Sequence, residues 1–300
     1  MTQPAPAPTR APVVRSLIVL AVVALIAVGL SFAGSARSAE VAGLPLFTWA
    51  LIVAFGIQVI VFVPSALVPT ERYFDLTGSL TYISVTVALL VLAPERTLVT
   101  WLLAGMVVLW AVRLGSFLFI RVTRSGSDGR FDQIKRDPLR FFSVWVIQGL
   151  WVSMTALAAW FVLSSTPHPS VSAWTIVGVL VWALGFGIEV VADAQKNAFR
   201  ANEANKGRFI TSGLWSVSRH PNYFGEILLW VGVALVALPA LEGWQYVGLI
   251  SPVFVAFLLI KVSGIPLLEK RAQERWGESE EYRAYVARTP VLVPFVGRRG

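Results

Sequence analysis

The chain has 300 residues, of which 56% are hydrophobic and only 14% are charged, and its mean hydropathy is +0.70. This composition excludes a soluble domain, which needs more polar side chains to cover its core. The chain has no cysteine and only two histidines, which excludes disulfides, thiolate zinc sites and iron–sulfur clusters, so we expect no bound metal.

Apolar stretches recur along the chain at about the 20-residue length that a helix needs to cross a bilayer. They cover roughly residues 16–33, 44–68, 74–93, 97–120, 141–163, 173–195, 223–239 and 245–263. The sequence therefore predicts an all-α, polytopic transmembrane helix bundle with seven or eight spans. Residues 1–34 also resemble a signal peptide, but their apolar run is longer than such a segment needs, which favours its retention.

The basic residues are distributed unevenly between the two sides of this arrangement. All 25 Lys and Arg residues except Arg37, Arg96 and Arg113 fall in segments on one side. The positive-inside rule makes that side cytoplasmic, together with both termini. Topology and contact with anionic membrane lipids explain the net charge of +8, alone or together with a phosphate-bearing ligand. We expect no nucleic acid partner.

Aromatic residues and glycines within the spans suggest how the helices are placed. Because the indole ring favours the headgroup level, tryptophans near span ends are expected to be interfacial anchors. These are Trp101, Trp145, Trp160, Trp174 and Trp244. In the sixth span Gly178, Gly185 and Gly187 lack the GxGxxG spacing and the strand context of a dinucleotide motif, so they predict close helix packing.

The third span carries polar residues on one predicted helical face. Glu71, Asp75, Gly78 and Tyr82 follow one another at helical spacing. Ionisable groups in lipid are costly, which makes this face a candidate catalytic site. The alternative is that the two acids mark a helix start, with Thr70 as its N-cap.

The sixth span repeats this pattern with Glu189, Asp193, Lys196 and Arg200, which descend from the bilayer into a basic loop. A ladder of salt bridges along the helix is the alternative explanation. The following loop and helix start offer guanidinium groups, an imidazole and free helix amides, which together suit a phosphate or pyrophosphate. The residues that would provide them include Arg208, Arg219, His220, Asn222 and Tyr223.

The C-terminal region from 266 to 297 is typical of a charged amphipathic helix followed by an apolar, proline-bounded segment. We expect that segment to return to the membrane surface, and the region as a whole to cap the cofactor site.

Four stretches together resemble the steroid 5-alpha-reductase family, and best its bacterial branch. Residues 187–226 carry E-x-x-x-D-x-x-x-x-x-x-R, then G-R-F-I-x-S-G-L-W and S-R-H-P-N-Y-F-G-E, which ends at Glu226. Upstream stand T-E-R-Y-F-D-L-T-G-S-L-T-Y and G-R-F-D-Q-I-K, and the tail carries E-K-R-A-x-x-R-W-G-x-x-x-x-Y-x-x-Y-x-x-R-T-P. The match covers about 70–295 and divides the chain into N-terminal helices, 1–68, and a reductase-like membrane domain, 69–300.

The resemblance implies a membrane reductase of the bacterial cytoplasmic membrane that binds NADPH and transfers hydride to an activated C=C bond, as in an enone. The substrate would be an apolar, steroid- or lipid-like molecule that enters from the bilayer. The residues at the cofactor would be Glu189, Asp193, Arg200, Arg208, Arg219, His220, Asn222, Tyr223 and Glu226. A carboxyl group and a phenol would polarise the substrate carbonyl, and Glu71, Asp75 and Tyr82 are the candidates.

The chain departs from the steroid enzymes at two positions. Trp110 stands near the place expected for their catalytic tyrosine, and Glu189 stands where they carry an amide. A membrane methyltransferase that uses S-adenosylmethionine is the main alternative, because R-H-P-x-Y-x-G before a helix is similar to its cofactor loop. A membrane scaffold or lipid carrier without catalytic activity is the third possibility.

Overall fold

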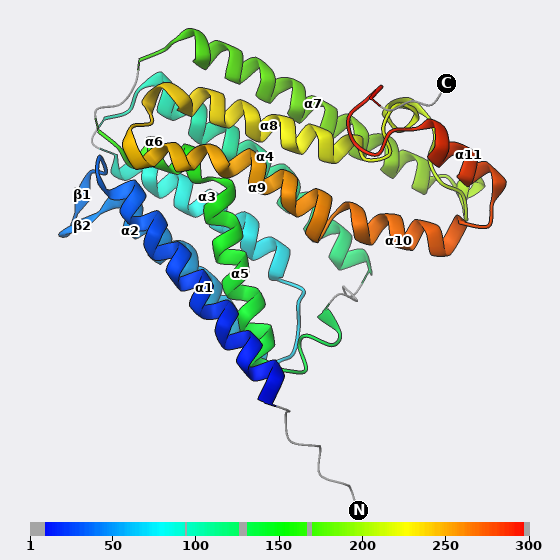
Figure 1. Cartoon of the computed structure of the whole chain (residues 1–300), viewed down its shortest axis with the longest axis horizontal. Helices are drawn as coiled ribbons and strands as arrows, with labels where there is room; N and C mark the ends of the chain where they lie inside the picture. The colour runs from blue at the N-terminus through cyan, green and yellow to red at the C-terminus, as the bar shows by residue number, and fades with distance from the viewer. Residues whose placement is uncertain (1–9, 94, 126–130, 167–169, 297–300) are drawn as a thin grey trace, which may run out of the picture. The chain divides into compact units, whose positions relative to one another are not determined.

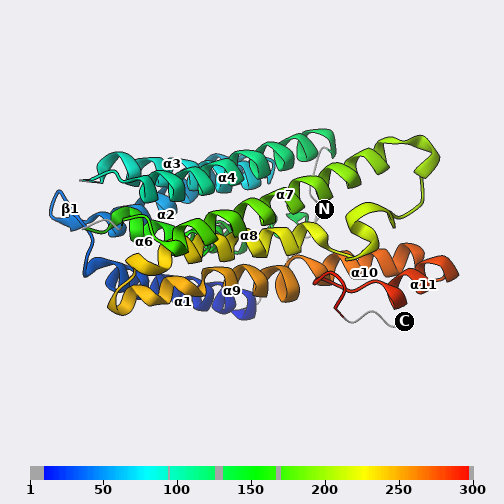
Figure 2. The ribbon, with the colours of Figure 1, turned by 90° about the horizontal axis from the view of Figure 1, so that it is seen from above.

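A computed structural model describes residues 10–93, 95–125, 131–166 and 170–296. Its regular elements are mostly α-helices, with short 3-10 and π stretches and one short hairpin (Figures 1 and 2). The chain separates into two compact units. Unit 1 comprises residues 1–170 and 240–248, and unit 2 comprises residues 171–239 and 249–300. Their boundaries differ from the predicted domains, 1–68 and 69–300. Those domains were defined by the extent of the motifs and stay a prediction.

In the part of unit 1 that the structure describes there are six α-helices and the hairpin. The helices are α1 (Arg10–Ser35), α2 (Leu46–Leu67), α3 (Phe74–Leu92), α4 (Leu98–Ser125), α5 (Pro138–Thr155) and α6 (Leu157–Ser164). Strands β1 (Glu40–Val41) and β2 (Leu44–Pro45) pair antiparallel, with Val41 opposite Leu44. Ala42 and Gly43 between them both have positive φ, as a tight two-residue hairpin turn requires.

Unit 2 holds α7 (Ala173–Ala201), α8 (Pro221–Ala237), α9 (Ile250–Phe257), α10 (Ile265–Trp276) and α11 (Glu280–Arg288). A π-helical stretch, Leu258–Val262, connects α9 to the turn before α10. Helix α7 begins at a capping box in which the Ser172 and Thr175 side chains each bind the other residue's backbone N–H. Helices α7 and α8 run side by side along most of their length (Figure 2).

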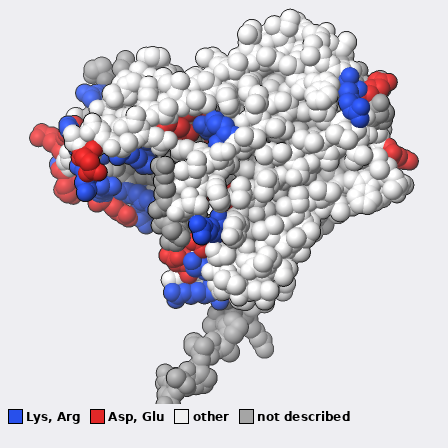
Figure 3. All heavy atoms as spheres, turned by 180° about the vertical axis from the view of Figure 1, so that it is seen from behind, with Lys and Arg blue, Asp and Glu red and all other residues white. Residues whose placement is uncertain are grey.

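Seven helical segments among the described residues are long and apolar enough to cross a membrane, and an eighth forms if α5 and α6 count as one span. This confirms the all-α polytopic bundle of seven or eight spans. The fifth predicted span, 141–163, is bent by 67° at Ala156. Wide areas of the surface in Figure 3 carry no charged side chain, as expected of a protein that lies in lipid.

Two expectations about the spans are wrong in part. Trp145 and Trp160 are completely buried, and the indole N–H of Trp160 donates to Thr86 Oγ1 at 2.9 Å, so neither is an interfacial anchor. A Cβ added to Gly187 would meet no atom within 4 Å, so Gly187 provides no close helix contact.

Gly178 and Gly185 do permit close packing, against Gly232 and Gly225 of α8. A Cβ on Gly185 would lie 2.5 Å from Leu229 N and 2.7 Å from Gly225 O, distances that backbone atoms cannot accommodate without shifting. The two helices therefore approach at backbone contact, the geometry that small residues allow inside membranes.

Candidate functional site

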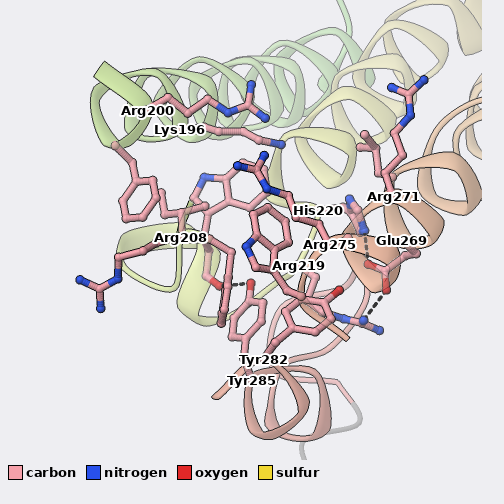
Figure 4. Close-up of a pocket in the computed structure, with 17 residues that line it drawn as sticks. Lys196, Arg200, Arg208, Arg219, His220, Glu269, Arg271, Arg275, Tyr282 and Tyr285 are labelled. Carbon is pink, nitrogen blue, oxygen red and sulfur yellow. Dashed lines mark hydrogen bonds and ion pairs between the residues drawn. The ribbon is translucent and has the colours of Figure 1, made fainter. Parts of the chain in front are cut away.

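A cavity of about 310 Å³ opens in unit 2 at the C-terminal end of α7 (Figure 4). The loop before α8 forms one wall, and α10 with α11 forms the opposite wall. Six basic residues line it: Lys196, Arg200, Arg208, Arg219, Arg271 and Arg275. Six aromatic residues line it as well: Phe199, Phe209, Trp215, Trp276, Tyr282 and Tyr285.

The loop that forms one wall is pinned to α7 by hydrogen bonds. The indole N–H of Trp215 donates to Ala192 O at 3.0 Å, and the Leu214 N–H donates to Gln195 Oε1 at 2.9 Å. Gly213 turns the chain here with φ +60, and a Cβ at that position would lie 2.6 Å from the Gln195 side chain. The loop geometry therefore depends on a glycine at position 213.

Aromatic side chains join this loop to the C-terminal helices. The ring of Phe209 lies 5.1 Å from Tyr282 and 5.6 Å from both Trp276 and Tyr285. The buried hydroxyl of Tyr285 donates to Trp215 O at 2.7 Å. Burial raises the pKa of Tyr285, so the phenol stays neutral. The cluster thus fixes α11 against the loop.

The segment after α11 runs back along the same loop. The Arg219 N–H donates to Pro290 O at 2.9 Å, and the Ser218 hydroxyl donates to Leu292 O at 2.7 Å. This segment therefore holds the residues before α8 in place. Some of its apolar side chains are exposed, among them Val291 and Phe295. Its return to the membrane surface stays a prediction.

Among the residues that the structure describes, Glu269 is the acid that lines the cavity. Its carboxylate binds Arg219 Nη1 and lies 2.7 Å from His220 Nε2, as the dashed lines in Figure 4 show. Burial lowers the pKa of His220, because the imidazolium loses its hydration, and the Glu269 carboxylate only partly opposes this. His220 is therefore neutral at pH 7.

The remaining charge in the cavity is strongly positive. Lys196 lies over the Trp215 ring with Nζ 4.4 Å from its centroid, and Arg275 lies over Trp276 at 4.9 Å. Arg208 is exposed, and in Figure 4 its guanidinium group points away from the other basic groups, at the rim. Cationic groups beside aromatic faces suit a ligand that combines negative charge with flat rings.

Four of the predicted cofactor residues line this cavity: Arg200, Arg208, Arg219 and His220. The other five lie outside its lining. The Asn222 amide donates to Asp193 Oδ1 at 3.2 Å, and Tyr223 stacks on the His220 ring at 5.6 Å. Glu189 is buried beside Gly225, and Glu226, the residue after Gly225 on α8, is half-buried.

Sequence reasoning did not assign Lys196, Glu269, Arg271 and Arg275 to the site, nor the six aromatic residues. Arg271 follows Glu269 by two residues, and Arg275 lies one helical turn after Arg271. This spacing places the two arginines on one helical face, which could have indicated a basic surface at the site. The expectation that the C-terminal region caps the site agrees with the positions of α10 and α11, which line the cavity.

The candidate catalytic residues lie in unit 1. Helix α3 begins at Phe74 with Tyr73 as N-cap, so Glu71 precedes the helix. The prediction that Glu71 shares a helical face with Asp75 and Tyr82 is therefore wrong, and so is the prediction that Thr70 is the N-cap. Glu71 is buried and forms an ion pair with Lys135 at 2.9 Å. This hydrogen bond raises the pKa of Lys135, so the Lys135 ammonium is charged at neutral pH.

Asp75 and Tyr82 do lie on α3. Asp75 is half-buried in its first turn. Tyr82 is buried, and its ring meets Trp110 of α4 edge-on at 5.1 Å. Trp110 is thus a direct neighbour of the candidate phenol. Gly78 lies between Asp75 and Tyr82 on α3, and a Cβ there would lie 2.8 Å from Gln148 Nε2. The Gln148 amide of α5 therefore packs against α3 at Gly78.

Curated proteins that are similar to parts of the chain include two plant reductases and a fungal methyltransferase. The Delta(14)-sterol reductase of Arabidopsis thaliana is 26% identical over 157 residues, which cover 49% of this chain and 39% of that protein. The steroid 5-alpha-reductase DET2 of the same plant is 24% identical over 123 residues, 40% of this chain and 41% of DET2. The probable O-methyltransferase ustE of Ustilaginoidea virens is 37% identical over 60 residues, 20% and 21% of the two chains.

These matches span between about one fifth and two fifths of the relatives' own lengths. No solved structure matches the chain. The family described as "Protein of unknown function (DUF1295)" matches residues 61–289, which is most of the chain. The protein therefore belongs to this family, which is the steroid 5-alpha-reductase-like family of integral membrane proteins.

Proposed function

We propose that the protein is an NADPH-dependent membrane reductase that transfers hydride to an activated C=C bond of an apolar, steroid- or lipid-like substrate. The observation that carries the proposal is the cavity of unit 2, in which six basic and six aromatic side chains surround a single acid. The printed activities of the two plant relatives, a sterol reductase and a steroid reductase, support the same reaction class.

The cavity suits one part of a dinucleotide. Its volume of about 310 Å³ is at the low end for small-molecule sites, so it fits a phosphate-bearing nucleoside better than a whole dinucleotide. The aromatic faces of Trp215 and Trp276 would take a flat base, and the guanidinium groups of Arg271 and Arg275 would take phosphate oxygens. Arg219 adds little net charge, because Glu269 neutralises it.

The bound cofactor would supply the hydride, and the chain must stabilise the charge that develops on the substrate carbonyl. An acid or phenol aimed at that oxygen lowers the barrier. Of the three candidates, Asp75 and Tyr82 suit this role better than Glu71, whose ion pair with Lys135 favours the carboxylate over the protonated acid. An apolar substrate would reach them from the bilayer, here proposed to be the cytoplasmic membrane of a bacterium.

Binding of NADPH and NADH to the purified protein, measured by calorimetry in detergent, tests the cofactor. A 2′-phosphate needs positive charge that NADH does not, so Arg208→Ala, Arg271→Ala or Arg275→Ala should weaken NADPH binding more than NADH binding. Arg283→Ala is the matched control, because Arg283 is exposed on α11 and does not line the cavity. Equal losses for both nucleotides in all three variants would refute the 2′-phosphate role, and no NADPH binding by the wild type would refute the proposal.

A methyltransferase that uses S-adenosylmethionine is the second candidate, supported by the 37% identity with the probable O-methyltransferase over 60 residues. That cofactor carries no phosphate, and its one carboxylate would leave most of the six basic residues of the cavity without an anionic partner, which is why we favour the reductase. Mass spectrometry of the nucleotide that copurifies with the protein separates the two. S-adenosylmethionine in place of NADP(H) would decide for the methyltransferase.

A further inference from the structure

Glu269 on α10 joins two consecutive residues of the loop before α8. One carboxylate oxygen binds Arg219 Nη1, and the other lies 2.7 Å from His220 Nε2. The side chains of Arg219 and His220 are only 12% and 6% exposed, and that of Glu269 is 30% exposed. The bridge is thus largely shielded from water at the wall of the cavity.

The imidazole of His220 is held in one orientation. Its ring stacks on Tyr223 with an interplanar angle of 9°. Its backbone N–H donates to Ser218 Oγ at 3.2 Å, and Ser218 is itself bound to Leu292 O. Rotation of the ring would break both the stacking and the contact with Glu269, so the ring nitrogens are not interchangeable.

The contact with Glu269 determines which ring nitrogen carries the hydrogen. A carboxylate only accepts hydrogen bonds, so His220 must donate to it from Nε2. His220 Nδ1 is buried and has no hydrogen-bond partner among the described residues. A hydrogen on Nδ1 would be a buried donor without an acceptor, which is costly, so Nδ1 carries a lone pair.

The charged and titratable groups around the ring agree with a neutral imidazole. Glu269 of α10 favours the imidazolium, whereas Arg219 of the loop and Lys196 of α7 oppose it, as does burial. Tyr223 of α8 contacts the ring through its face. The sum of these effects leaves His220 neutral with one defined tautomer.

We propose that Glu269 is a positioning residue that holds His220 as the neutral Nε2–H tautomer, and that the Nδ1 lone pair thereby becomes the acceptor for a hydroxyl or amino group of the ligand in this cavity. A buried acceptor without a partner is uncommon in proteins, and a ligand donor would satisfy it. The ligand half of this inference rests on the proposed function, since a nucleotide carries both ribose hydroxyls and amino groups. The tautomer half rests on the chain alone.

Nitrogen NMR of histidine tests both halves, because the chain has only two histidines. Protein labelled with ¹⁵N-histidine and carrying His168→Gln shows the His220 ring alone. We expect Nε2 to be protonated and Nδ1 unprotonated at pH 7. In Glu269→Gln the side-chain oxygen can face Arg219 and the amide N–H can face His220 Nε2, which moves the hydrogen to Nδ1.

Glu274→Gln is the matched control, because Glu274 lies on the same helix and is exposed, 3.9 Å from Lys270. It should leave the His220 tautomer unchanged. A charged ring or a protonated Nδ1 in the wild type would overturn the tautomer assignment, and so would the same spectrum for wild type and Glu269→Gln.

Addition of NADPH tests the acceptor role. We expect the Nδ1 resonance to shift as a hydrogen bond forms there, while Nε2 keeps its hydrogen. Calorimetry on the same sample separates the ways in which this can fail. If NADPH binds but Nδ1 does not respond, the acceptor role is wrong and the proposed function stands. If NADPH does not bind, the proposed function fails and takes the ligand half with it.

Discussion

The contact between α7 and α8 predicts that alanine has opposite effects at two glycines of one helix. Gly185 meets the backbone of α8, where an added Cβ would lie 2.5 Å from Leu229 N and 2.7 Å from Gly225 O. Gly187 lies two residues further along α7, and an added Cβ there meets nothing within 4 Å. Gly185→Ala must therefore push the two helices apart, whereas Gly187→Ala adds a methyl group without a clash.

The difference between the two variants isolates the packing effect. Both replace glycine by alanine inside the same helix and gain a similar helix propensity, about 0.5–1 kcal/mol. Overpacking of a tight contact costs about 1–3 kcal/mol, and only Gly185→Ala incurs it. At roughly 2–4 °C per kcal/mol for a chain of this size, Gly185→Ala should unfold several degrees below Gly187→Ala.

Thermal unfolding in one detergent, followed by intrinsic fluorescence, measures this difference. Because α7 carries Lys196 and Arg200 and the loop before α8 carries His220, the shifted helices should also weaken nucleotide binding in Gly185→Ala. Equal unfolding temperatures for the two alanine variants would refute the close approach of α7 and α8. A lower temperature for Gly187→Ala than for Gly185→Ala would refute the assignment of the helix faces.

Three further predictions concern unit 1 and the topology. Glu71→Gln leaves Lys135 without its main partner and should cost up to about 3 kcal/mol, whereas Asp132→Asn, an exposed residue 3.5 Å from the same Lys135, should cost far less. Because the pKa of Lys135 is raised, the stabilisation that its charge contributes is present below its ordinary pKa of 10.5 and is lost as the pH rises through the raised pKa. A pH series of unfolding temperatures checks this, and equal effects of the two variants would contradict the pairing. Asp75→Asn and Tyr82→Phe should lower turnover of NADPH with an enone by about 10²–10⁴-fold without weakening NADPH binding. Near-native turnover in both variants would place the proton donor elsewhere, and Glu189 would be the next candidate. A cysteine introduced at Ser170 should react only with external reagents and one at Ser279 only from the cytoplasm, and the reverse pattern would overturn the predicted orientation.

Hydropathy predicts the spans well because the bilayer sets their length, but it says little about which side chains face lipid. Trp145 and Trp160 illustrate this, since lipid and protein interior are equally apolar environments for an indole ring. The bend at Ala156 gave no signal either, because no proline or glycine stands there. Helix boundaries within polar stretches are also ambiguous, and Glu71 thus fell outside the helix to which its spacing assigned it.

The candidate site is predictable where its residues follow one another along the chain. The composition of the loop from Arg208 to His220, with its arginines and its histidine, predicts a site for an anionic ligand. The role of Glu269 is not predictable in this way, because its partners Arg219 and His220 are about 50 residues away and an acid in a charged helix resembles a solvent-exposed residue. Only the folded chain shows that this acid faces inward.

The two walls of the cavity are synthesised at different times, because they lie far apart in the sequence. Residues 196–220 leave the ribosome well before α10, α11 and the segment at 290–292, which supply Glu269, Tyr285 and the backbone oxygens that hold the loop. Until those later residues are made, the basic, aromatic half of the cavity contributed by residues 196–220 lacks its opposite wall. A chain that stopped at residue 264 would keep the helices from α1 to α9 and still lack this site, so membrane insertion alone is no measure of whether a variant has formed its pocket.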